Sequence, residues 1–238
     1  MIDAADVQRL MLGHYTVPEV WPERKDPHPL SGKQIVVTGF LIRHPHGPFL
    51  FDTGFGQGTD ETATRYKAVR RDVVEALAEA GVAAKDVRAI ANCHMHFDHG
   101  GGNHRFPGTT ILAQQAEIAN AHQKDYTVAA DVLEYPDARI ETLDGEGDIA
   151  AGLRLIPTPG HTTGHQSLVV ETRQGRIVLA GQAQSFASDH AIAHYARGLA
   201  LRGEPHADYP AWMDRFAELD PWRVLFAHDL AIWERALK

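Results

Sequence analysis

Three histidines and one aspartate stand within six positions of this chain, at His94, His96, Asp98 and His99. Residues 87–91, just before them, alternate in the manner of a buried strand, and glycines follow the cluster. A loop that begins where a strand ends is free of the strand's period of two, so it can direct several side chains to one place. Imidazole and carboxylate groups bind zinc, iron and manganese. The stretch therefore predicts a metal site at the end of a strand.

The spacing of these residues leaves the number of metals open. His94 and His96 are two positions apart and can reach one metal, while Asp98 and His99 turn away toward a neighbouring one. A mononuclear site would use part of the cluster, and a dinuclear site would divide it. A helical zinc site is excluded because residues two apart lie on different faces of a helix. A polar turn with incidental histidines is disfavoured because histidine is an uncommon residue.

Composition indicates a globular protein with one domain over residues 1–238. The chain has 44% hydrophobic and 23% charged residues, which is ordinary for a soluble protein, and no linker divides it. No apolar run is long enough to span a membrane, so no membrane partner is expected. The net charge of −8 argues against binding of nucleic acid.

The expected location is the cytoplasm. Asp3 and Asp6 stand where a signal peptide would carry basic residues. The single cysteine, Cys93, excludes an internal disulfide and suits a reducing compartment. At the end of a strand, Cys93 is expected to be a small buried apolar residue rather than a nucleophile.

The hydrophobic patterns predict a chain in which strands dominate, with helices between and after them. Strands are expected over residues 7–12, 34–43, 49–52, 87–91, 109–113, 139–143, 153–157, 167–171, 176–180 and 223–226. Helices are expected over residues 61–80, 114–122, 188–202, 210–219 and 230–237. Residues 15–30 are rich in proline and are expected to form a surface loop, a flap over the active site or a contact in a homodimer. This order of elements suits two sheets packed face to face with helices outside.

The cluster at residues 94–99 resembles the His-x-His-x-Asp-His signature of the metallo-β-lactamase-fold hydrolases. Three more motifs agree and occur in the family's order: Phe-Asp-Thr-Gly at 51–54, Thr-Pro-Gly-His-Thr-Thr-Gly-His at 158–165 and Phe-Ala-His-Asp at 226–229. Four ordered motifs spread over residues 35–230 make the resemblance specific. It implies an α/β (α+β) fold, namely a four-layer αββα sandwich of two mixed β-sheets flanked by helices.

The resemblance also implies ligands for one or two divalent metals, with zinc expected and iron or manganese as alternatives. The first metal would take His94, His96 and His161, and the second would take Asp98, His99 and His228. Asp52, His165 and Asp229 would support these ligands from behind. Asp98 would also be catalytic, by holding or accepting the proton of the attacking water.

One position departs from the family's pattern. Dinuclear members carry a bridging aspartate after a glycine at the end of an apolar strand, and in the matching segment, 179–183, this chain carries Gln182. An aspartate is charged and can link two cations, whereas glutamine offers one neutral carbonyl oxygen. Gln182 stays a candidate ligand, but the second metal is expected to bind more weakly. The three-histidine metal keeps an open position, so hydrolysis with one metal is expected; a degenerate site that binds metal without turnover is the alternative.

Within the family, the chain is most similar to the N-acyl-homoserine-lactone lactonase branch, through residues 7–10, the turn at 43–47 and the motifs named above. The resemblance implies an enzyme that opens a lactone, or cleaves a related ester, by attack of metal-bound hydroxide on a small-molecule substrate. That branch places a substrate-orienting tyrosine three residues after the bridging aspartate, where this chain has Ser185. Ser185, Phe186 and the next tyrosine, Tyr195, are the candidate substrate contacts. Residues 15–30, 126–135 and 186–195 are expected to line an acyl pocket.

Other functions of the same fold stay open. A thioester hydrolase of the glyoxalase kind would use the same ligands, but it has a C-terminal helical substrate domain for which this chain is short. A β-lactamase is disfavoured by the Asp98–His99 pair and by the acidic N-terminus, which indicates a cytoplasmic protein. A redox di-iron protein is disfavoured because it would carry a glutamate in the place of His96. Outside the enzymes, Gln182 favours a metal-binding or ligand-sensing module descended from a hydrolase.

Overall fold

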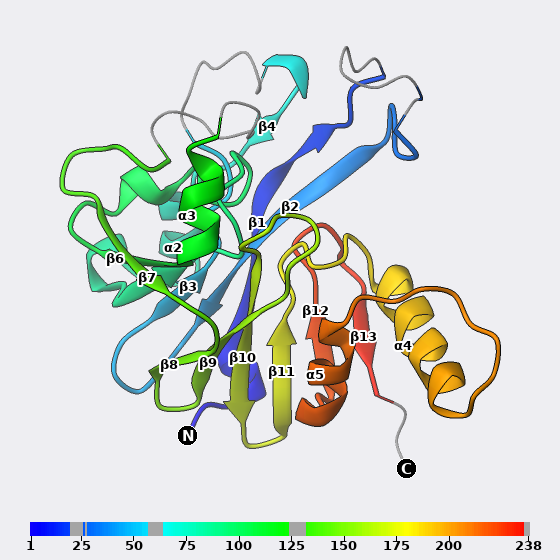
Figure 1. The fold of residues 1–238 in the computed structure, drawn as a ribbon. Coiled ribbons are helices and arrows are strands. Elements are labelled where there is room, and N and C mark those ends of the chain that lie inside the picture. Colours follow the sequence, from blue (N-terminus) through cyan, green and yellow to red (C-terminus); the bar gives the residue numbers. More distant parts are fainter. Residues whose placement is uncertain (20–25, 27, 57–63, 124–131, 236–238) are drawn as a thin grey trace.

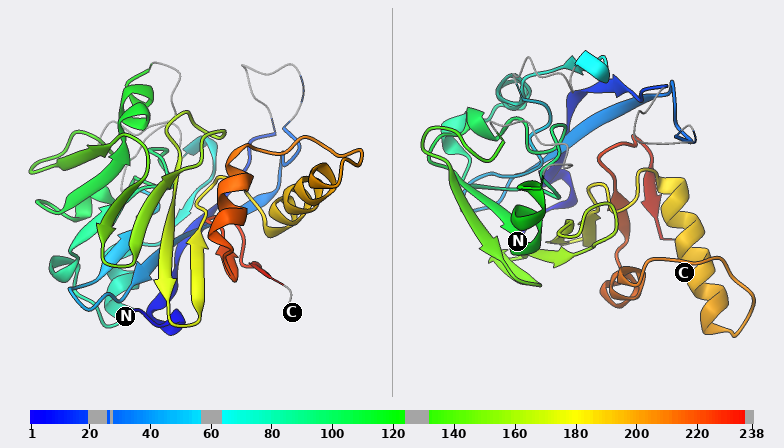
Figure 2. Two further views of the ribbon diagram at one scale, coloured as in Figure 1. Left: turned by 60° about the horizontal axis from the view of Figure 1, so that its bottom comes forward. Right: turned by 45° about the horizontal axis from the view of Figure 1, so that its top comes forward.

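Two β-sheets pack face to face in the computed structural model of the chain, which describes residues 1–19, 26, 28–56, 64–123 and 132–235. Helices cover the outer face of each sheet, so the molecule has four layers (Figure 1). Helices α4 and α5 lie outside the second sheet, on the opposite side from α2 and α3 (Figure 2). The αββα sandwich expected from the sequence is confirmed.

The first sheet has seven strands, in the spatial order β4 (Val69–Arg70), β1 (Val7–Thr16), β2 (Gln34–Ile42), β3 (Phe49–Phe51), β5 (Ala89–Ala91), β6 (Thr110–Gln114) and β7 (Arg139–Leu143). Strands β4, β1, β2 and β3 pair antiparallel, whereas β3, β5, β6 and β7 are parallel to one another. The loops that follow β3 and β5 therefore leave the sheet at the same edge.

The second sheet has six strands, in the spatial order β13 (Ile232–Glu234), β12 (Arg223–Leu225), β11 (Gly175–Leu179), β10 (Gln166–Thr172), β9 (Leu153–Pro157) and β8 (Gly147–Ala150). Only the pair of β11 and β12 is parallel, and both β9 and β11 are antiparallel to β10, which lies between them. Strands β9, β11 and β12 thus run in one direction, and the loops that follow them also share an edge.

Large apolar side chains, such as Phe40, Phe51 and Leu168, fill the space between the sheets and are fully buried. The helices on the outer faces are α2 (Val73–Glu79) and α3 (Gln115–Ala121) over the first sheet, and α4 (Ala187–Leu201) and α5 (Trp212–Leu219) over the second. Burial of apolar surface contributes about 25 cal/mol per Å², so these layers are the main source of stability. None of the helices in the described ranges is long and apolar enough to cross a lipid bilayer.

The expected helix over 61–80 is wrong in its middle, because residues 64–65 and 73–79 are helical and residues 66–72 are not. Helix α2 begins only after Asp72, whose side chain accepts the N–H of Val74 at 2.7 Å and so caps the first turn. Upstream, Val69–Arg70 form β4, which pairs with the edge of β1. The apolar spacing was misleading because Val69 is 54% exposed and does not belong to the buried face of a helix. Residues 61–63 lie outside the described ranges.

The expected helix over 230–237 is also wrong, because this segment forms the strand β13 at Ile232–Glu234. Ile232–Glu234 pairs antiparallel with Arg223–Leu225, so the open edge of β12 supplies backbone partners that outweigh the helical propensity of the segment. Strand β8 was not expected. Its four residues include the exposed Asp148, and only the pairing with β9 defines it as a strand.

Candidate metal centre

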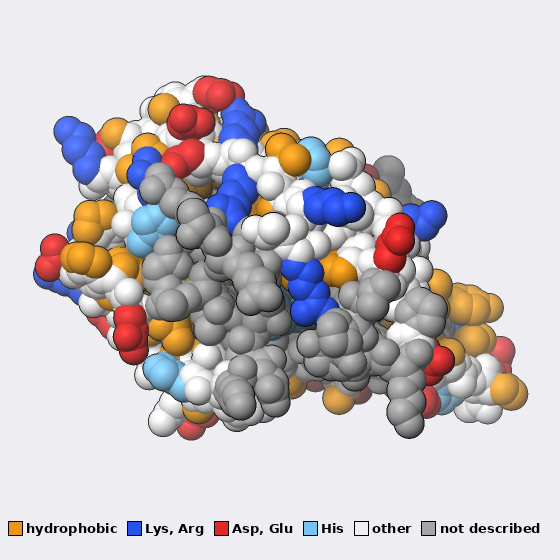
Figure 3. All heavy atoms as spheres, turned by 90° about the horizontal axis from the view of Figure 1, so that it is seen from above, with side chains coloured by type: hydrophobic (Ala, Val, Ile, Leu, Met, Phe, Trp, Pro, Cys, Tyr) orange, Lys and Arg blue, Asp and Glu red, His pale blue; other side chains and the backbone are white. Residues whose placement is uncertain are grey.

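Loops that follow five strands meet at one edge of the sandwich. They are Asp52 after β3, residues 92–99 after β5, 158–165 after β9, 181–182 after β11 and 226–229 after β12. His99, by itself, contacts residues of three other loops, namely Asp52, Gln182 and His228. Viewed from above, Lys and Arg side chains lie near the middle of the face, although the chain as a whole is acidic (Figure 3).

Glycine allows the ligand loop to fold back tightly after His99. A Cβ at Gly101 would lie 2.1 Å from the backbone nitrogen of Gly56 and 2.2 Å from the carbonyl oxygen of Phe97. No other residue fits between these two segments without moving them. The glycines that follow the histidine cluster are therefore required for the shape of the loop.

The first donor group consists of His94, His96 and His161. The Nδ1 atom of His96 lies 2.9 Å from Nε2 of His94 and 3.1 Å from Nε2 of His161. His94 is fully buried, His96 is half-buried and His161 is exposed, so the group opens toward the surface on one side. The structure thus brings together three imidazole nitrogens that come from the ends of β5 and β9.

The second donor group consists of Asp98, His99 and His228. The Nε2 atoms of His99 and His228 are 3.2 Å apart, and each lies 3.6 Å from Oδ2 of Asp98. All three side chains are buried. His228 is fixed from behind, because its Nδ1 faces the carbonyl oxygen of Val36 at 2.8 Å.

Both groups fit a divalent metal. Nitrogens bound to one zinc ion at tetrahedral angles lie about 3.3 Å apart, close to the spacings found in each group. Burial lowers the pKa of His94 well below its usual range and that of His96 to about 4, so both rings are neutral at neutral pH. Neutral imidazole is the form that binds metal.

Asp52 supports the second group from below. Its backbone has a φ of +64°, a left-handed conformation that costs energy in residues other than glycine and is often found at functional sites. The strained turn directs Oδ2 to Nδ1 of His99 at 3.0 Å, while Oδ1 accepts the N–H of Cys93 at 2.8 Å. A carboxylate behind a histidine fixes the ring's orientation and makes it a better ligand.

His99 differs from its neighbours in charge. Burial by itself lowers its pKa, but the carboxylates of Asp98 and Asp52 and hydrogen bonds with Asp52 and Gln182 outweigh burial and raise the pKa to about 9. Its Nε2 lies 3.1 Å from Oε1 of Gln182, so both ring nitrogens face acceptors. By contrast, burial and the neighbouring His99 lower the pKa of His228 to about 4.

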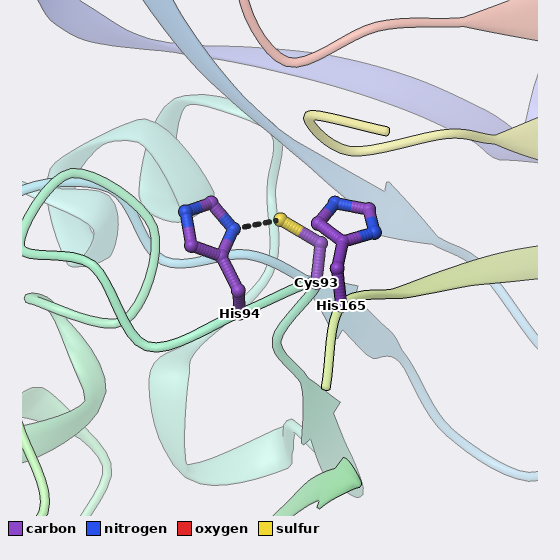
Figure 4. A group of neighbouring side chains, drawn as sticks. All are labelled: Cys93, His94 and His165. Atoms are coloured by element: carbon purple, nitrogen blue, oxygen red, sulfur yellow. Dashed lines mark hydrogen bonds between the residues drawn. The ribbon is translucent and has the colours of Figure 1, made fainter. Parts of the chain in front are cut away.

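Cys93 and His165 lie close to His94, the fully buried member of the first group (Figure 4). The Cys93 thiol is fully buried, 3.1 Å from Nδ1 of His94, and burial raises its pKa well above the usual value. His165 pairs through Nδ1 with the Thr158 hydroxyl at 2.8 Å, and its Nε2 accepts the N–H of Gln182 at 3.1 Å. Both ring nitrogens of His165 are therefore occupied, which suits a supporting residue better than a ligand.

A cavity of about 300 Å³ opens beside both donor groups. Its lining is Tyr15, Val17, His28, Leu30, Ile35, Tyr66, His96, Phe97, Asp98, His161, Gln182, Ser185, Phe186 and His228. Ser185 and Phe186, the candidate substrate contacts named from the sequence, thus line this cavity. A larger hollow of about 880 Å³, elsewhere on the sandwich, has no histidine among its described lining residues.

Two candidates lie elsewhere. Tyr195 is 65% exposed on α4 and does not line the cavity, because α4 turns His190 and Ala193 inward and Tyr195 outward. Among the described residues, the hydrogen-bond partners of the Asp229 carboxylate are backbone N–H groups and not the ring of a proposed ligand. Its carboxylate accepts the N–H of Ala187 at 2.9 Å and so holds the start of α4. No motif in the sequence points to Tyr15 individually, and its ring lies edge-on to His228.

Comparison with known proteins identifies the class. The chain belongs to the metallo-beta-lactamase superfamily, whose family model matches residues 33–228. It is 31% identical over 152 residues to an N-acyl homoserine lactonase of Bacillus cereus, a match that covers 59% of this chain and 60% of that protein. It is 28% identical over 181 residues to the N-acyl homoserine lactonase AttM of Rhizobium radiobacter, covering 66% of this chain and 68% of the relative. The chain thus spans about 60% of the length of its Bacillus relative.

Solved structures agree on the fold. An N-acyl homoserine lactone hydrolase with the product N-hexanoyl-L-homoserine bound at its catalytic metal centre superposes with a TM-score of 0.71 at 22% identity, covering 97% of this chain and 94% of that one. A quorum-quenching N-acyl homoserine lactone lactonase also gives 0.71, at 24% identity, and covers 97% and 93%. Divalent-metal binding is a property of this fold family, and the two donor groups suit it.

Proposed function

We propose that this chain is a metal-dependent hydrolase that opens lactones or cleaves related esters. The observation that carries the proposal is the junction of two donor groups, His94/His96/His161 and Asp98/His99/His228, with a cavity whose walls are largely apolar. A bound divalent metal would lower the pKa of water and polarise a carbonyl group. Lactonase relatives support the substrate class.

Zinc is the metal we expect in the first group. Three neutral imidazoles with one open position suit a catalytic zinc site, and iron or manganese would accept the same donors less selectively. In the second group, Gln182 supplies a neutral oxygen where an aspartate would supply a charge, so we propose that this group holds its metal more weakly. The single thiol of Cys93 supports a reducing, cytoplasmic location.

In this proposal, Asp98 transfers protons during hydrolysis. Its Oδ2 faces both His99 and His228, and the residue also lines the cavity. A carboxylate at this point can accept a proton from the attacking water and return it to the oxygen of the leaving alcohol. In a lactone that oxygen stays attached to the product, so one molecule with a new carboxylate and a new hydroxyl leaves the site.

The cavity walls suit an acyl chain and a few polar contacts. Val17, Leu30 and Phe186 contribute apolar surface, which excludes water from the reaction. Ser185 and Tyr15 contribute hydroxyl groups to the same lining. The Tyr15 side chain makes no hydrogen bond with any described residue, so its hydroxyl is free to orient a substrate oxygen.

The test is turnover of a panel of substrates by protein loaded separately with Zn, Mn and Fe. The panel contains acyl-homoserine lactones of increasing chain length, simple lactones, aryl esters and one thioester. Hydrolysis that is fastest on lactones or esters and stops on chelation supports the proposal. Equal turnover by fully metal-free protein would overturn the mechanism. Tight binding of lactones by the metal-loaded protein without turnover would favour the ligand-sensing alternative.

A further inference from the structure

A buried carboxylate outside the two donor groups joins the loops that carry the first one. Glu117, on α3, is only 1% exposed, and both of its oxygens accept hydrogen bonds. Oε1 accepts the backbone N–H of Met95 at 2.8 Å, and Oε2 accepts the hydroxyl of Thr162 at 2.6 Å. Hydrogen bonds to a charged acceptor are short and about twice as strong as those between neutral groups.

The partners of Glu117 are direct neighbours of all three histidines in the first group. Met95 stands between His94 and His96, and Thr162 follows His161. These two loops leave different sheets, since one follows β5 and the other follows β9. Glu117 therefore links the two halves of the sandwich at the point where one metal would need ligands from both.

The loop after β9 also lies directly on α3. A Cβ at Gly164 would come within 2.0 Å of the backbone nitrogen of Glu117. Among the described residues, the carbonyl oxygen of Thr162 accepts hydrogen bonds within its own loop, from the N–H groups of Gly160 and His165. Glycine at 164 allows the close approach, and the Thr162–Glu117 hydrogen bond fixes the loop at that distance.

We propose that Glu117 is a positioning residue that holds His161 in place relative to His94 and His96 for binding of the first metal. The inference rests on the metal site of the proposed function and concerns its affinity rather than its chemistry. An apolar side chain of similar size would fill the same space, but it would remove the carboxylate that accepts the Met95 N–H and the Thr162 hydroxyl. The three nitrogens would then be free to separate, and the metal would have to draw them together at the expense of its binding free energy.

The test is Glu117→Gln, which keeps the size of the side chain and removes the charge. Zinc affinity is measured by competition with a chromophoric chelator, and the melting temperature of the metal-free protein is measured alongside. The expected result is zinc binding at the tight site weakened by about 10- to 100-fold, with a melting temperature close to that of the wild type. Glu79→Gln, an exposed position on α2 that pairs with Arg71, is the matched control and should leave zinc affinity unchanged.

Thr162→Val provides a second, milder variant, since it removes one of the two hydrogen bonds and keeps the Met95 contact. It should weaken zinc binding less than Glu117→Gln does. The double variant should lose less zinc-binding free energy than the sum of the two single losses, because Glu117 and Thr162 contact one another. Unchanged zinc affinity in both variants overturns the inference while leaving the hydrolase proposal intact. A loss of zinc affinity that is explained entirely by unfolding of the metal-free protein would also overturn the inference. Failure of the wild type to bind zinc, manganese or iron would overturn both.

Discussion

The two donor groups differ in what surrounds them. The first group, His94/His96/His161, contains only imidazoles and opens to the cavity through the exposed His161. The second group, Asp98/His99/His228, is buried, and each of its histidines is fixed from behind by an oxygen, from Asp52 or Val36. The second group is therefore the more rigid of the two, and the first is the more accessible.

The substitution at position 182 falls on the more rigid group. Oε1 of Gln182 approaches Nε2 of His99, an atom that would bind the second metal, at 3.1 Å. Rigid support fixes geometry but adds no negative charge at the metal, and charge is what a bridging aspartate would supply. Preorganisation of the ligands and negative charge at the metal are therefore separate properties of this site. We expect the open, neutral group to bind the first metal equivalent and the rigid group to bind the second.

The largest expected effect comes from His96→Ala. Its Nδ1 lies within 3.1 Å of the ligand atoms of both other histidines, so its loss removes the centre of the first group. Turnover of lactones or aryl esters should fall to the background rate, and elemental analysis should show loss of the tightly held metal. His228→Ala, in the second group, should retain measurable turnover, reduced by about 10- to 100-fold.

The control for both variants is His206→Ala, because His206 is exposed and, within the described ranges, its ring contacts the carbonyl oxygen of Ala207 and the ring of Tyr209, away from both donor groups. If His228→Ala proved as damaging as His96→Ala, the two groups would act as one unit. The distinction drawn between them would then be wrong.

A smaller effect, in the opposite direction, is expected from Gln182→Asp. The new carboxylate would stand beside His99 and add the negative charge that two divalent ions need. Affinity for the second metal equivalent should rise by about 10- to 100-fold, and binding of the first should change little. Titration calorimetry with zinc separates the two steps. Gln123→Asp, at an exposed position, is the control, and a wild-type protein that already holds two metals through extensive dialysis would contradict the expectation.

Much of the fold could be predicted from the sequence because most strands carry strong apolar patterns. The hairpin of β10 and β11, for instance, falls where alternating residues flank Gln174-Gly175. The errors lie where tertiary contacts outweigh local preference. Val69 pairs with β1 instead of entering a helix, and Ile232 adds a strand to the edge of β12. Short edge strands leave little trace in the chain itself.

The residues proposed as metal ligands could be named from the sequence because each lies in a motif with fixed spacing. Asp52 and His165, proposed as supports, also lie in motifs, whereas Glu117 does not. Glu117 looks like any acidic residue of an amphipathic helix until the structure brings its carboxylate to Met95 and Thr162. Distance along the chain favours Tyr195 as a substrate contact, but helix α4 turns its side chain outward. Spacing identifies residues that share one loop, but it carries no information about which distant element packs against that loop.

The smallest expected effect concerns Tyr15, which connects the cavity to the second group. Its ring lies edge-on to His228, with centroids 5.8 Å apart, and it is nearly buried at 9% exposed. Burial and the nearby Asp98 and Tyr66 raise its pKa well above the usual range, so the hydroxyl stays protonated, as a donor, through neutral and mildly alkaline pH. Tyr15→Phe keeps the ring and removes only that donor.

One hydrogen bond to substrate is worth about 1 kcal/mol, so kcat/KM should fall by about 5- to 10-fold with metal content unchanged. The reduction should be the same from pH 7 to pH 9, since the phenol does not titrate in that range. Tyr195→Phe makes the same chemical change on the exposed face of α4, and its kcat/KM should match the wild type. If Tyr15→Phe were equally silent on every lactone and ester tested, the ring would serve only to pack against His228. Orientation of the substrate would then rest on Ser185 and the metal ligands.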